Sequence, residues 1–347
     1  MIINCLAIVR YLKALVFFLF SISVFAQVDS TYVKDHIKPY GVKFAIGKDV
    51  LALDYTLEDK KSTQTFESNK PVSIGVGFLW GSSSFSFSHG FSFMREKEKG
   101  KTKATDFQYH HYGDKFLIDL YYKRNKGFYR YKENHKDDTP TAEDIFPDFK
   151  IHMYGALFQY VWNNEKYSLG AAYDLSKVQM KSAGSLLLGG GMFYSSLRNI
   201  PVLSEELNDY DKRTYHFGPN IGYGYNWVPY KKVLVAGAFT FGVNGAIEEN
   251  LLTNKTVFTV NPSVVGRFSL GYIGEEWIVS ASAVANGLFL NMKKDYQTGL
   301  LASTFNFTVI KRFNLKKEIK FLKKDYNWKE AIFGSKRNDV NNAINEE

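Results

Sequence analysis

The side chains best suited to chemistry gather on one stretch of the sequence. Asp106, Gln108 and His110 alternate along one face of a possible strand, and Asp119 and Lys123 lie on the matching face of the next segment. A carboxylate that orients an imidazole is the arrangement of a general base. One hypothesis is therefore a lipid hydrolase that uses His110 and Asp106.

The nucleophile for such an enzyme is only weakly indicated. Ser182 and Ser185 lie beside glycines, but neither stands in the G-x-S-x-G elbow of serine hydrolases. Inward polar side chains of a sheet also satisfy one another as an ordinary hydrogen-bond network. We prefer this second interpretation and expect no enzymatic activity.

Metal and phosphate motifs are not found in the sequence. His110 and His111 point to opposite faces of a strand, and no H-E-x-x-H or EF-hand string occurs. The acidic residues of 124–149 are interleaved with basic ones, so a solvated loop is preferred over a calcium site. We therefore expect no metal and no cofactor.

A basic segment, Arg-Glu-Lys-Glu-Lys-Gly-Lys-Thr-Lys, occupies 95–103. Such a loop can contact lipid phosphates or other polyanions outside the cell, or it can simply keep the protein soluble. Nucleic acid is disfavoured as a partner, because the aromatic residues are not interleaved with the basic ones.

The elements that carry these residues alternate with period two. Between 216 and 227 aromatic or aliphatic residues alternate with His, Gly and Asn, and the same holds for 72–80, 83–94, 256–272 and 301–313. Successive side chains of a strand point to opposite faces, so each segment predicts a strand with one apolar and one polar face.

Two all-β architectures fit this alternation. A soluble sandwich or soluble periplasmic β-protein packs the apolar faces inward. A transmembrane up-and-down antiparallel β-barrel turns them outward to lipid. The polar faces are rich in Gly, Ser and Asn instead of Lys and Glu, and the strands are long, so we prefer the membrane barrel. Its aromatic girdle is predicted to contain Trp80, Trp162, Trp227, Tyr272 and Phe313.

The opposite faces define the predicted lumen. The inward candidates are Asp106, Gln108, His110, Asp119, Lys123, Asn220, Arg267, Asn306 and Arg312. If the barrel conducts ions, the cations among these residues favour anions.

The connections predict the topology. Short turns alternate with long polar loops, which places the short turns and both termini in the periplasm and the long loops outside. The alternation stays consistent up to residue 176, and afterwards only if 178–199 is two strands broken at Gly189–Gly191. We expect an even number of strands, about 14 with that break and about 12 without it.

Composition sets the limits of these interpretations. The chain has 347 residues, a formal net charge of +9 and a mean hydropathy of −0.24. Beyond the N-terminus no apolar run is long enough for a membrane helix. Residues 1–26 are typical of a cleaved signal peptide that contains the single cysteine, Cys5. We then expect a periplasmic segment at 27–42, the barrel at 43–313, and a basic, partly helical tail at 314–347.

The chain also resembles a known family. The strings at 100–103, 106–113, 119–122, 126–129, 159–168, 181–191 and 217–223 are similar to Bacteroidota proteins grouped as domain of unknown function 4421. The resemblance covers about residues 30–313 and implies an exported, outer-membrane-barrel-like protein with no assigned activity. The tail after Phe313 departs from the family's usual ending at a terminal aromatic strand.

The sequence thus predicts an outer-membrane barrel that acts as a pore, a small-solute transporter or an envelope scaffold. The expected partners are outer-membrane lipid, small solutes or lipid phosphates, and the barrel assembly machinery.

Overall fold

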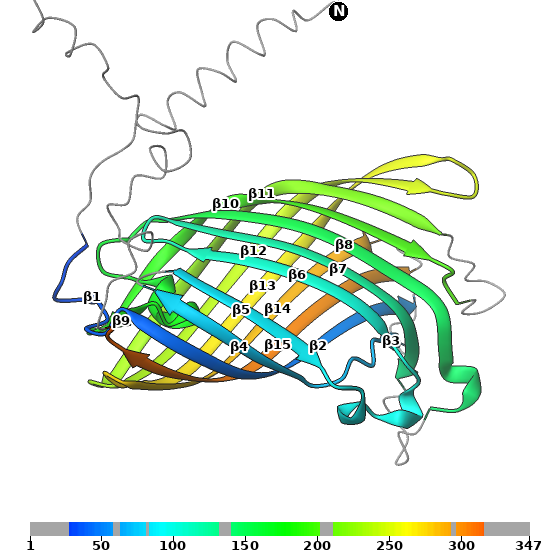
Figure 1. Ribbon diagram of the computed structural model, residues 1–347. Coiled ribbons are helices and arrows are strands. Elements are labelled where there is room, and N and C mark those ends of the chain that lie inside the picture. Colours follow the sequence, from blue (N-terminus) through cyan, green and yellow to red (C-terminus); the bar gives the residue numbers. More distant parts are fainter. Residues whose placement is uncertain are drawn as a thin grey trace, which may run out of the picture.

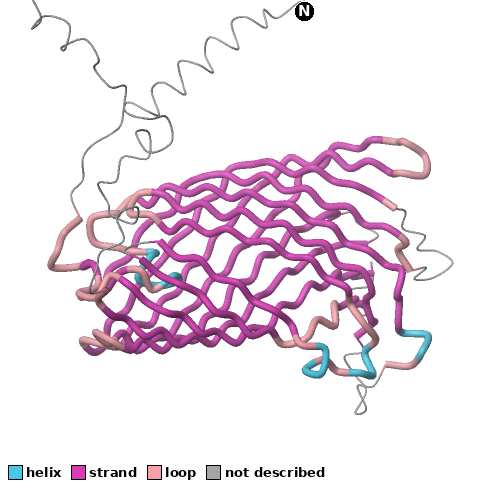
Figure 2. The backbone as a smooth tube through the Cα atoms, viewed as in Figure 1, coloured by secondary structure: helices cyan, strands magenta, loops and turns pink. Residues whose placement is uncertain are grey.

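The chain forms a β-barrel of long, tilted strands (Figure 1). The computed structural model describes residues 28–57, 63–80, 83–131, 140–201, 211–292 and 296–315. The predicted signal peptide at 1–26 lies outside the described residues, as does the predicted tail beyond residue 315. Figure 2 shows that strands make up almost all of the described wall.

Ten strands hydrogen-bond in a closed antiparallel ring. In ring order they are β2 (Tyr40–Leu57), β3 (Thr63–Glu67), β7 (Phe116–Tyr131), β8 (Ile145–Val161), β10 (Ala183–Arg198), β11 (Lys212–Tyr230), β12 (Val233–Asn250), β13 (Thr256–Ile273), β14 (Trp277–Met292) and β15 (Tyr296–Phe313). Pairing of β15 with β2, from Tyr296 with Leu57 to Phe313 with Tyr40, closes the ring.

Three further strands extend this sheet. The first half of β2 pairs with β4 (Ser73–Trp80), which pairs with β5 (Ser83–Gly90), while β6 (Lys103–Tyr112) pairs with β7. Within the described sheet, β5 and β6 each have one paired edge, and these two strands do not pair with each other. We call the gap in pairing between β5 and β6 the lateral window (Figure 1).

The alternation of the sequence corresponds to the two faces of this wall. Tyr223 and Tyr225 of β11 are exposed on the outside, whereas His216 and Asn226 are buried inside. The prediction of an all-β antiparallel barrel is confirmed.

The predicted strand count needs a correction. The ring has ten strands near the long loops, and twelve strands form the wall where β4, β5 and β6 replace β3. The predicted break at Gly189–Gly191 is wrong, because β10 is continuous. A Cβ at Gly189 would lie 1.9 Å from the carbonyl oxygen of Phe158, so this glycine allows close approach of β8 instead of ending the strand.

The segment between β8 and β10 fills one end of the barrel instead of continuing the wall. Here a π-helix, η4 (Gly170–Asp174), is followed by β9 (Lys177–Gln179), which pairs with β1 (Val33–Asp35). Leu169, Ala171 and Ala172 are buried. We call residues 163–182 the plug. It lies at the short-turn end, where the connections 113–115, 231–232 and 274–276 also lie.

One carbonyl group of the plug contacts both the wall and the N-terminal segment. The Leu175 carbonyl oxygen accepts a hydrogen bond of 2.6 Å from Arg312 Nη2 and lies 3.0 Å from His36 Nε2. Leu175 has a left-handed backbone conformation with φ of 61°, which turns this carbonyl at the end of η4.

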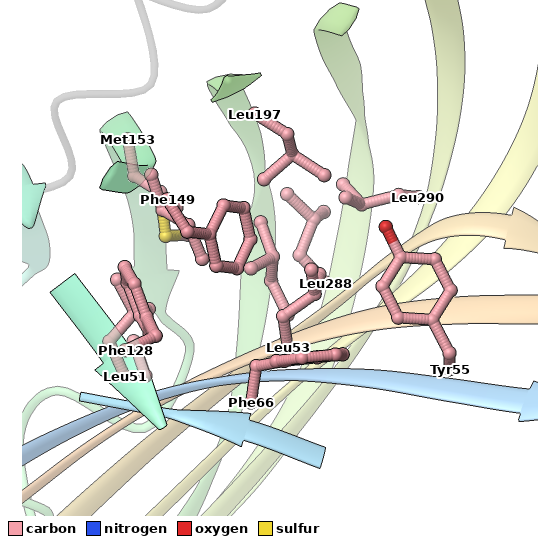
Figure 3. Close-up of a cluster of buried hydrophobic side chains, with 13 residues drawn as sticks. Leu51, Leu53, Tyr55, Phe66, Phe128, Phe149, Met153, Leu197, Leu288 and Leu290 are labelled. Carbon is pink, nitrogen blue, oxygen red and sulfur yellow. The ribbon is translucent and has the colours of Figure 1, made fainter. Parts of the chain in front are cut away.

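The opposite, long-loop end of the lumen is filled by apolar side chains (Figure 3). The cluster consists of Leu51, Leu53, Tyr55, Phe66, Phe128, Phe149, Ile151, Met153, Leu197, Leu288, Leu290, Leu300 and Ala302. The Phe128 and Phe149 ring centroids are 4.8 Å apart, and those of Phe66 and Phe146 are 5.3 Å apart. The described lumen is therefore packed at both ends. Within the described ranges, no helix has the length and apolarity needed to cross a membrane.

Candidate functional site

A cluster of charged side chains lies in the lumen behind the lateral window. The β6–β7 pairing sets His110 opposite Asp119 and Asp106 opposite Lys123. His110 Nδ1 is 2.8 Å from Asp119 Oδ1, and His110 Nε2 is 3.2 Å from Gln108 Oε1. The structure places these five predicted residues on paired positions of β6 and β7.

An ion pair crosses the lumen at this level. Arg267 Nη2 donates a hydrogen bond to Asp119 Oδ2, and both side chains are buried. Arg267 lies on β13, five strands from β7 around the ring of ten, so the pair spans the barrel. The sequence predicts both residues as lumenal, but period-two alternation carries no information about contacts across a barrel.

Two members of the cluster were missed by the sequence analysis. Lys70 Nζ lies 3.1 Å from Asp49 Oδ2 and also donates to Asp106 Oδ2. Asp49 accepts a 2.6 Å hydrogen bond from Thr304 Oγ1. Lys70 lies in the break between β3 and β4, and the string Asn69-Lys70-Pro71 is the only sequence signal that could have indicated this kink.

The cluster is electrically balanced. Its three carboxylates face three cations, which are Lys70, Lys123 and Arg267, and Lys123 Nζ is 3.9 Å from Asp106 Oδ2. Each charge therefore has a close partner of opposite sign, although Asp106 Oδ1 and the Nε and Nη1 groups of Arg267 are buried without a hydrogen-bond partner.

The other predicted lumenal residues lie elsewhere in the barrel. Asn220 Oδ1 accepts a 2.8 Å hydrogen bond from Gln159 Nε2. Asn306 lies against Gly47 on the neighbouring strand. Arg312, on β15, binds the plug through the Leu175 carbonyl oxygen. The nine candidates therefore do not form a single site.

The geometry does not favour the predicted hydrolase pair of His110 and Asp106. Asp106 contacts Lys70, while His110 is oriented by Asp119. The candidate nucleophiles lie near the plug, where Ser182 accepts from the Val228 N–H and Ser185 from the Asn163 N–H. Among the described residues no group of three potential metal-ligating His, Cys, Asp or Glu side chains occurs.

The window exposes part of this cluster. β6 is the strand whose residues are exposed on both faces, including the inward Gln108 and His110. The His110 side chain is 38% exposed, whereas Asp119 behind it is 9% exposed. Outward, Phe87 and Phe107 flank the window and are also exposed. Polar lumenal side chains of β6 are thus exposed at an unpaired edge of the sheet.

Aromatic side chains form two bands around the outside. At the short-turn end Trp162, Trp227 and Tyr272 are exposed, and the Phe313 ring stacks on Tyr40 at 6.4 Å. The side chain of Trp80 lies outside the described residues. Trp277, whose ring lies 4.6 Å from Lys311 Nζ, was missed.

The second band runs across β7, β8, β10 and β11. It consists of Tyr122, Tyr154, Tyr194 and Tyr215, which are cross-strand neighbours with ring centroids 5.0, 5.4 and 5.1 Å apart. We call this row the tyrosine band. Along β8 it is separated from Trp162 by roughly 26 Å of strand, at about 3.3 Å per residue. At the 35–45° tilt of barrel strands this length projects to roughly 20 Å along the barrel axis, somewhat less than the apolar band of about 25 Å in outer-membrane barrels.

Comparison with known proteins gives a family and several distant structures. The family model described as "Domain of unknown function (DUF4421)" matches residues 27–313. No curated protein matches the sequence.

Three solved structures illustrate the distant likeness. The Escherichia coli outer membrane protease OmpT is 10% identical, with a TM-score of 0.36 over 79% of this chain and 97% of that one. The TodX monoaromatic hydrocarbon channel is 7% identical, with a TM-score of 0.24 over 80% and 91%. The Yersinia pestis attachment protein Ail is 8% identical, with a TM-score of 0.23 over 78% and 99%. Likeness at this level carries no argument about activity.

Proposed function

The chain belongs to the DUF4421 family, and from this membership and the geometry above we propose a non-enzymatic outer-membrane barrel that admits a small ligand sideways. The ligand enters through the lateral window and meets the charged cluster behind it. The main support for this proposal is that the described lumen is packed at both ends while the wall lacks pairing between β5 and β6. This favours a lateral transporter or binding protein over an open axial pore.

Membrane placement is supported by the outer surface. Large apolar side chains such as Phe239, Phe241 and Phe305 are exposed along the middle of the strands. Exposed aromatic side chains lie at the short-turn end, and the tyrosine band lies towards the long loops on β7, β8, β10 and β11. A soluble β-protein would bury these faces, because exposed apolar surface on this scale drives association in water.

Packing at both ends argues against axial flow. Leu53, Phe66 and Leu300 are almost fully buried at the long-loop end, and Leu169 and Ala172 are buried in the plug. Side chains with no accessible surface leave no water-filled path beside them.

The two edges of the window are in matching register. Through β3, Ala52 of β2 is level with Tyr129 of β7. Five ladder positions nearer the short turns, Gly47 is level with Gly90 of β5 through β4.

Counting five ladder positions along β7 from Tyr129 gives the matching level on β6, the other edge of the window. Because the bulge at Gly127 takes no ladder position, five positions from Tyr129 reach Lys123, which pairs with Asp106. Gly90 is therefore level with Asp106, and Ser88 is level with Gln108. Ser88 and Gln108 both point inward, so labelling at position 108 measures access through the window.

We test this proposal by labelling single cysteines in a Cys5→Ser background. Gln108→Cys should react with a membrane-partitioning maleimide in native outer membranes, because its side chain is exposed at the window. Phe239→Cys, which faces lipid, is the positive control, and the buried inward Thr240→Cys is the negative control. In a second experiment, a bis-maleimide links Ser88→Cys to Gln108→Cys across the window. This link should protect His110→Cys, which lies further inward, from the membrane-partitioning maleimide.

Two results would contradict lateral entry. One is protection of Gln108→Cys to the same degree as Thr240→Cys, which would leave an envelope scaffold as the better interpretation. The other is recovery of the chain in buffer-soluble fractions without heat-modifiable gel migration, which would remove the membrane placement itself.

A further inference from the structure

A row of basic side chains crosses the outside of four neighbouring strands. Lys103 of β6 pairs with Lys126 of β7, Lys126 pairs with Lys150 of β8, and Lys150 pairs with Arg198 of β10. Arg124 lies two residues from Lys126 on the same face of β7. We call these five residues the basic belt.

The belt has little internal compensation. Lys126 Nζ lies 2.9 Å from Asp148 Oδ1, and among the described residues no carboxylate is within ion-pair distance of the other four belt residues. Lys103, Arg124 and Arg198 are exposed. Five cations thus face one carboxylate on this surface.

Such a row is unfavourable on its own. Directly opposed residues of antiparallel strands have Cβ atoms about 5 Å apart, and like charges at that spacing destabilise the sheet. Arg213, on the next strand, shows the alternative, because Glu249 compensates it with hydrogen bonds of 2.6 and 2.8 Å. Among the described residues, no carboxylate compensates Lys103, Arg124, Lys150 or Arg198 in this way.

The position of the belt indicates which kind of anion would compensate it. Lys150 and the tyrosine-band residue Tyr154 are four residues apart on one face of β8, roughly 13 Å of strand. On β7 and β10 the order is the same, with Lys126 and Arg198 beyond Tyr122 and Tyr194. The belt therefore lies just beyond one edge of the apolar surface, at the depth of lipid headgroups, and on the side of the long loops.

The neighbouring loop adds to this surface. Residues 91–102 join β5 to β6 and include most of the basic segment of 95–103. Asn69 fixes the loop, because its Nδ2 donates to the carbonyl oxygens of Glu96 at 2.7 Å and Gly100 at 2.8 Å. Lys97 and Lys101 are exposed, and no described carboxylate pairs with them. The belt thus continues to the outer end of the window.

We propose that the basic belt binds the phosphate groups of anionic lipids in the leaflet on the long-loop side. Each phosphate bridges basic side chains of adjacent strands and converts their mutual repulsion into attraction. The acyl chains lie over the tyrosine band.

The test compares lipid selection by two neutralised variants. The full chain is equilibrated in mixed micelles of phosphatidic acid and phosphatidylcholine, and bound lipid is counted after gel filtration. The native protein should retain phosphatidic acid several-fold over its share of the micelle. Lys126→Gln/Lys150→Gln/Arg198→Gln should retain the two lipids in the micelle ratio. The matched control, Lys231→Gln/Lys232→Gln/Lys255→Gln, neutralises exposed lysines elsewhere and should select like the native protein.

Thermal unfolding is a second measurement, in which the belt substitutions should affect the melting temperature differently without and with anionic lipid. Without anionic lipid, the belt variant should melt at or above the native midpoint, because repulsion is removed. With phosphatidic acid the native protein should gain several degrees and the belt variant should not. Inorganic phosphate at equal concentration should give neither effect, which distinguishes a lipid headgroup from a free anion.

Unchanged lipid selection in the belt variant, or equal stabilisation of both proteins by phosphatidic acid, would overturn the proposal. So would full stabilisation by inorganic phosphate. Lateral entry is tested separately by the Gln108 labelling, so either proposal can fail while the other stands.

Discussion

At the scale of single residues, the lumen is organised by charge pairs that connect distant strands. Asp119 contacts His110 on the adjacent strand and Arg267 across the barrel. Both the histidine and the arginine depend on one carboxylate, so Asp119 is the residue on which the cluster most depends. The sequence identified it as lumenal from alternation alone.

Removing that carboxylate should leave a buried, uncompensated cation. We expect Asp119→Asn to lower the free energy of unfolding by about 3–5 kcal/mol, as for other broken buried pairs. Urea unfolding in lipid bilayers, followed by heat-modifiable migration, measures this change.

The double variant Asp119→Asn/Arg267→Met is the control for this prediction, since it removes the charge along with its partner. It should recover much of the loss. A double variant as unstable as the single one would show that packing, and not charge compensation, governs the pair.

Only some contacts of the charged cluster could be predicted from the sequence. Asp106, Gln108, His110, Asp119 and Lys123 could be predicted together because they lie on consecutive strands, where register follows from a short turn. Lys70 and Arg267 join them through a kink and across the barrel. Neither contact leaves a periodic trace in the sequence.

At the scale of elements, the plug is held by groups that respond oppositely to pH. Burial raises the pKa of Asp174 at the end of η4 to about 6, against the lowering effects of Ser176, Lys43 and Arg312. Burial, with the nearby Arg312 charge, lowers the pKa of His36 to about 4. Burial therefore favours the neutral form of each group when the plug is docked: His36 is neutral above about pH 4, whereas Asp174 is neutral only below about pH 6.

The sign of each effect follows from proton binding. Docking stabilised by neutral Asp174 is fully present below the ordinary pKa near 3.8 and is lost as pH rises through about 6. Docking stabilised by neutral His36 is present above 6.5 and is lost as pH falls through about 4.

Asp174→Asn should therefore leave only the histidine dependence. In this variant, with Cys5→Ser, the maleimide labelling rate of the buried Ala171→Cys is divided at each pH by that of the exposed Lys231→Cys, which corrects for the fall in thiolate with pH. This ratio should rise only as pH falls from about 6.5 to about 4. Adding His36→Gln should flatten the profile. An Asp174→Asn profile identical to that of the parent protein would contradict the role of Asp174.

Sequence patterns predicted the wall elements better than the plug. Residues of the wall alternate because one side faces lipid and the other faces the lumen. The plug residues have no such pair of faces, since Leu169, Ala171 and Leu175 pack inside the barrel. Period-two alternation therefore carries no information about how these residues pack.

At the scale of the whole molecule, the barrel is a closed container with a side opening. The long-loop end is filled with apolar side chains, the short-turn end is filled by the plug, and a neutral charge cluster lies between them. Among the described residues, this arrangement supports the proposed lateral entry more than the open pore that the strand pattern also allowed.

Planar-bilayer recordings should show this directly. The native protein should give no steady conductance, because both ends are packed. Replacing Ala171 and Ala172 with Glu should displace the plug without changing the wall, but the apolar cluster should still block the axis. Steady, anion-selective conductance by the native protein would favour the predicted pore instead.

Two pairs of neighbouring strands in the wall, β2 with β15 and β5 with β6, differ greatly in the length of chain between them. The pairing of Tyr40 with Phe313 encloses nearly the whole described chain, whereas the unpaired edges of β5 and β6 are joined by one short loop. On loop-closure entropy alone, the long closure costs about 3 kcal/mol more than the short one. Pairing of β5 with β6 would have the smaller loop-closure cost, yet these strands are unpaired. The length of the connecting chain therefore does not account for the lack of pairing. In kinetic terms, pairing across the window is a local event that can form and break quickly. Closure of β2 on β15 has to wait until the rest of the wall has folded.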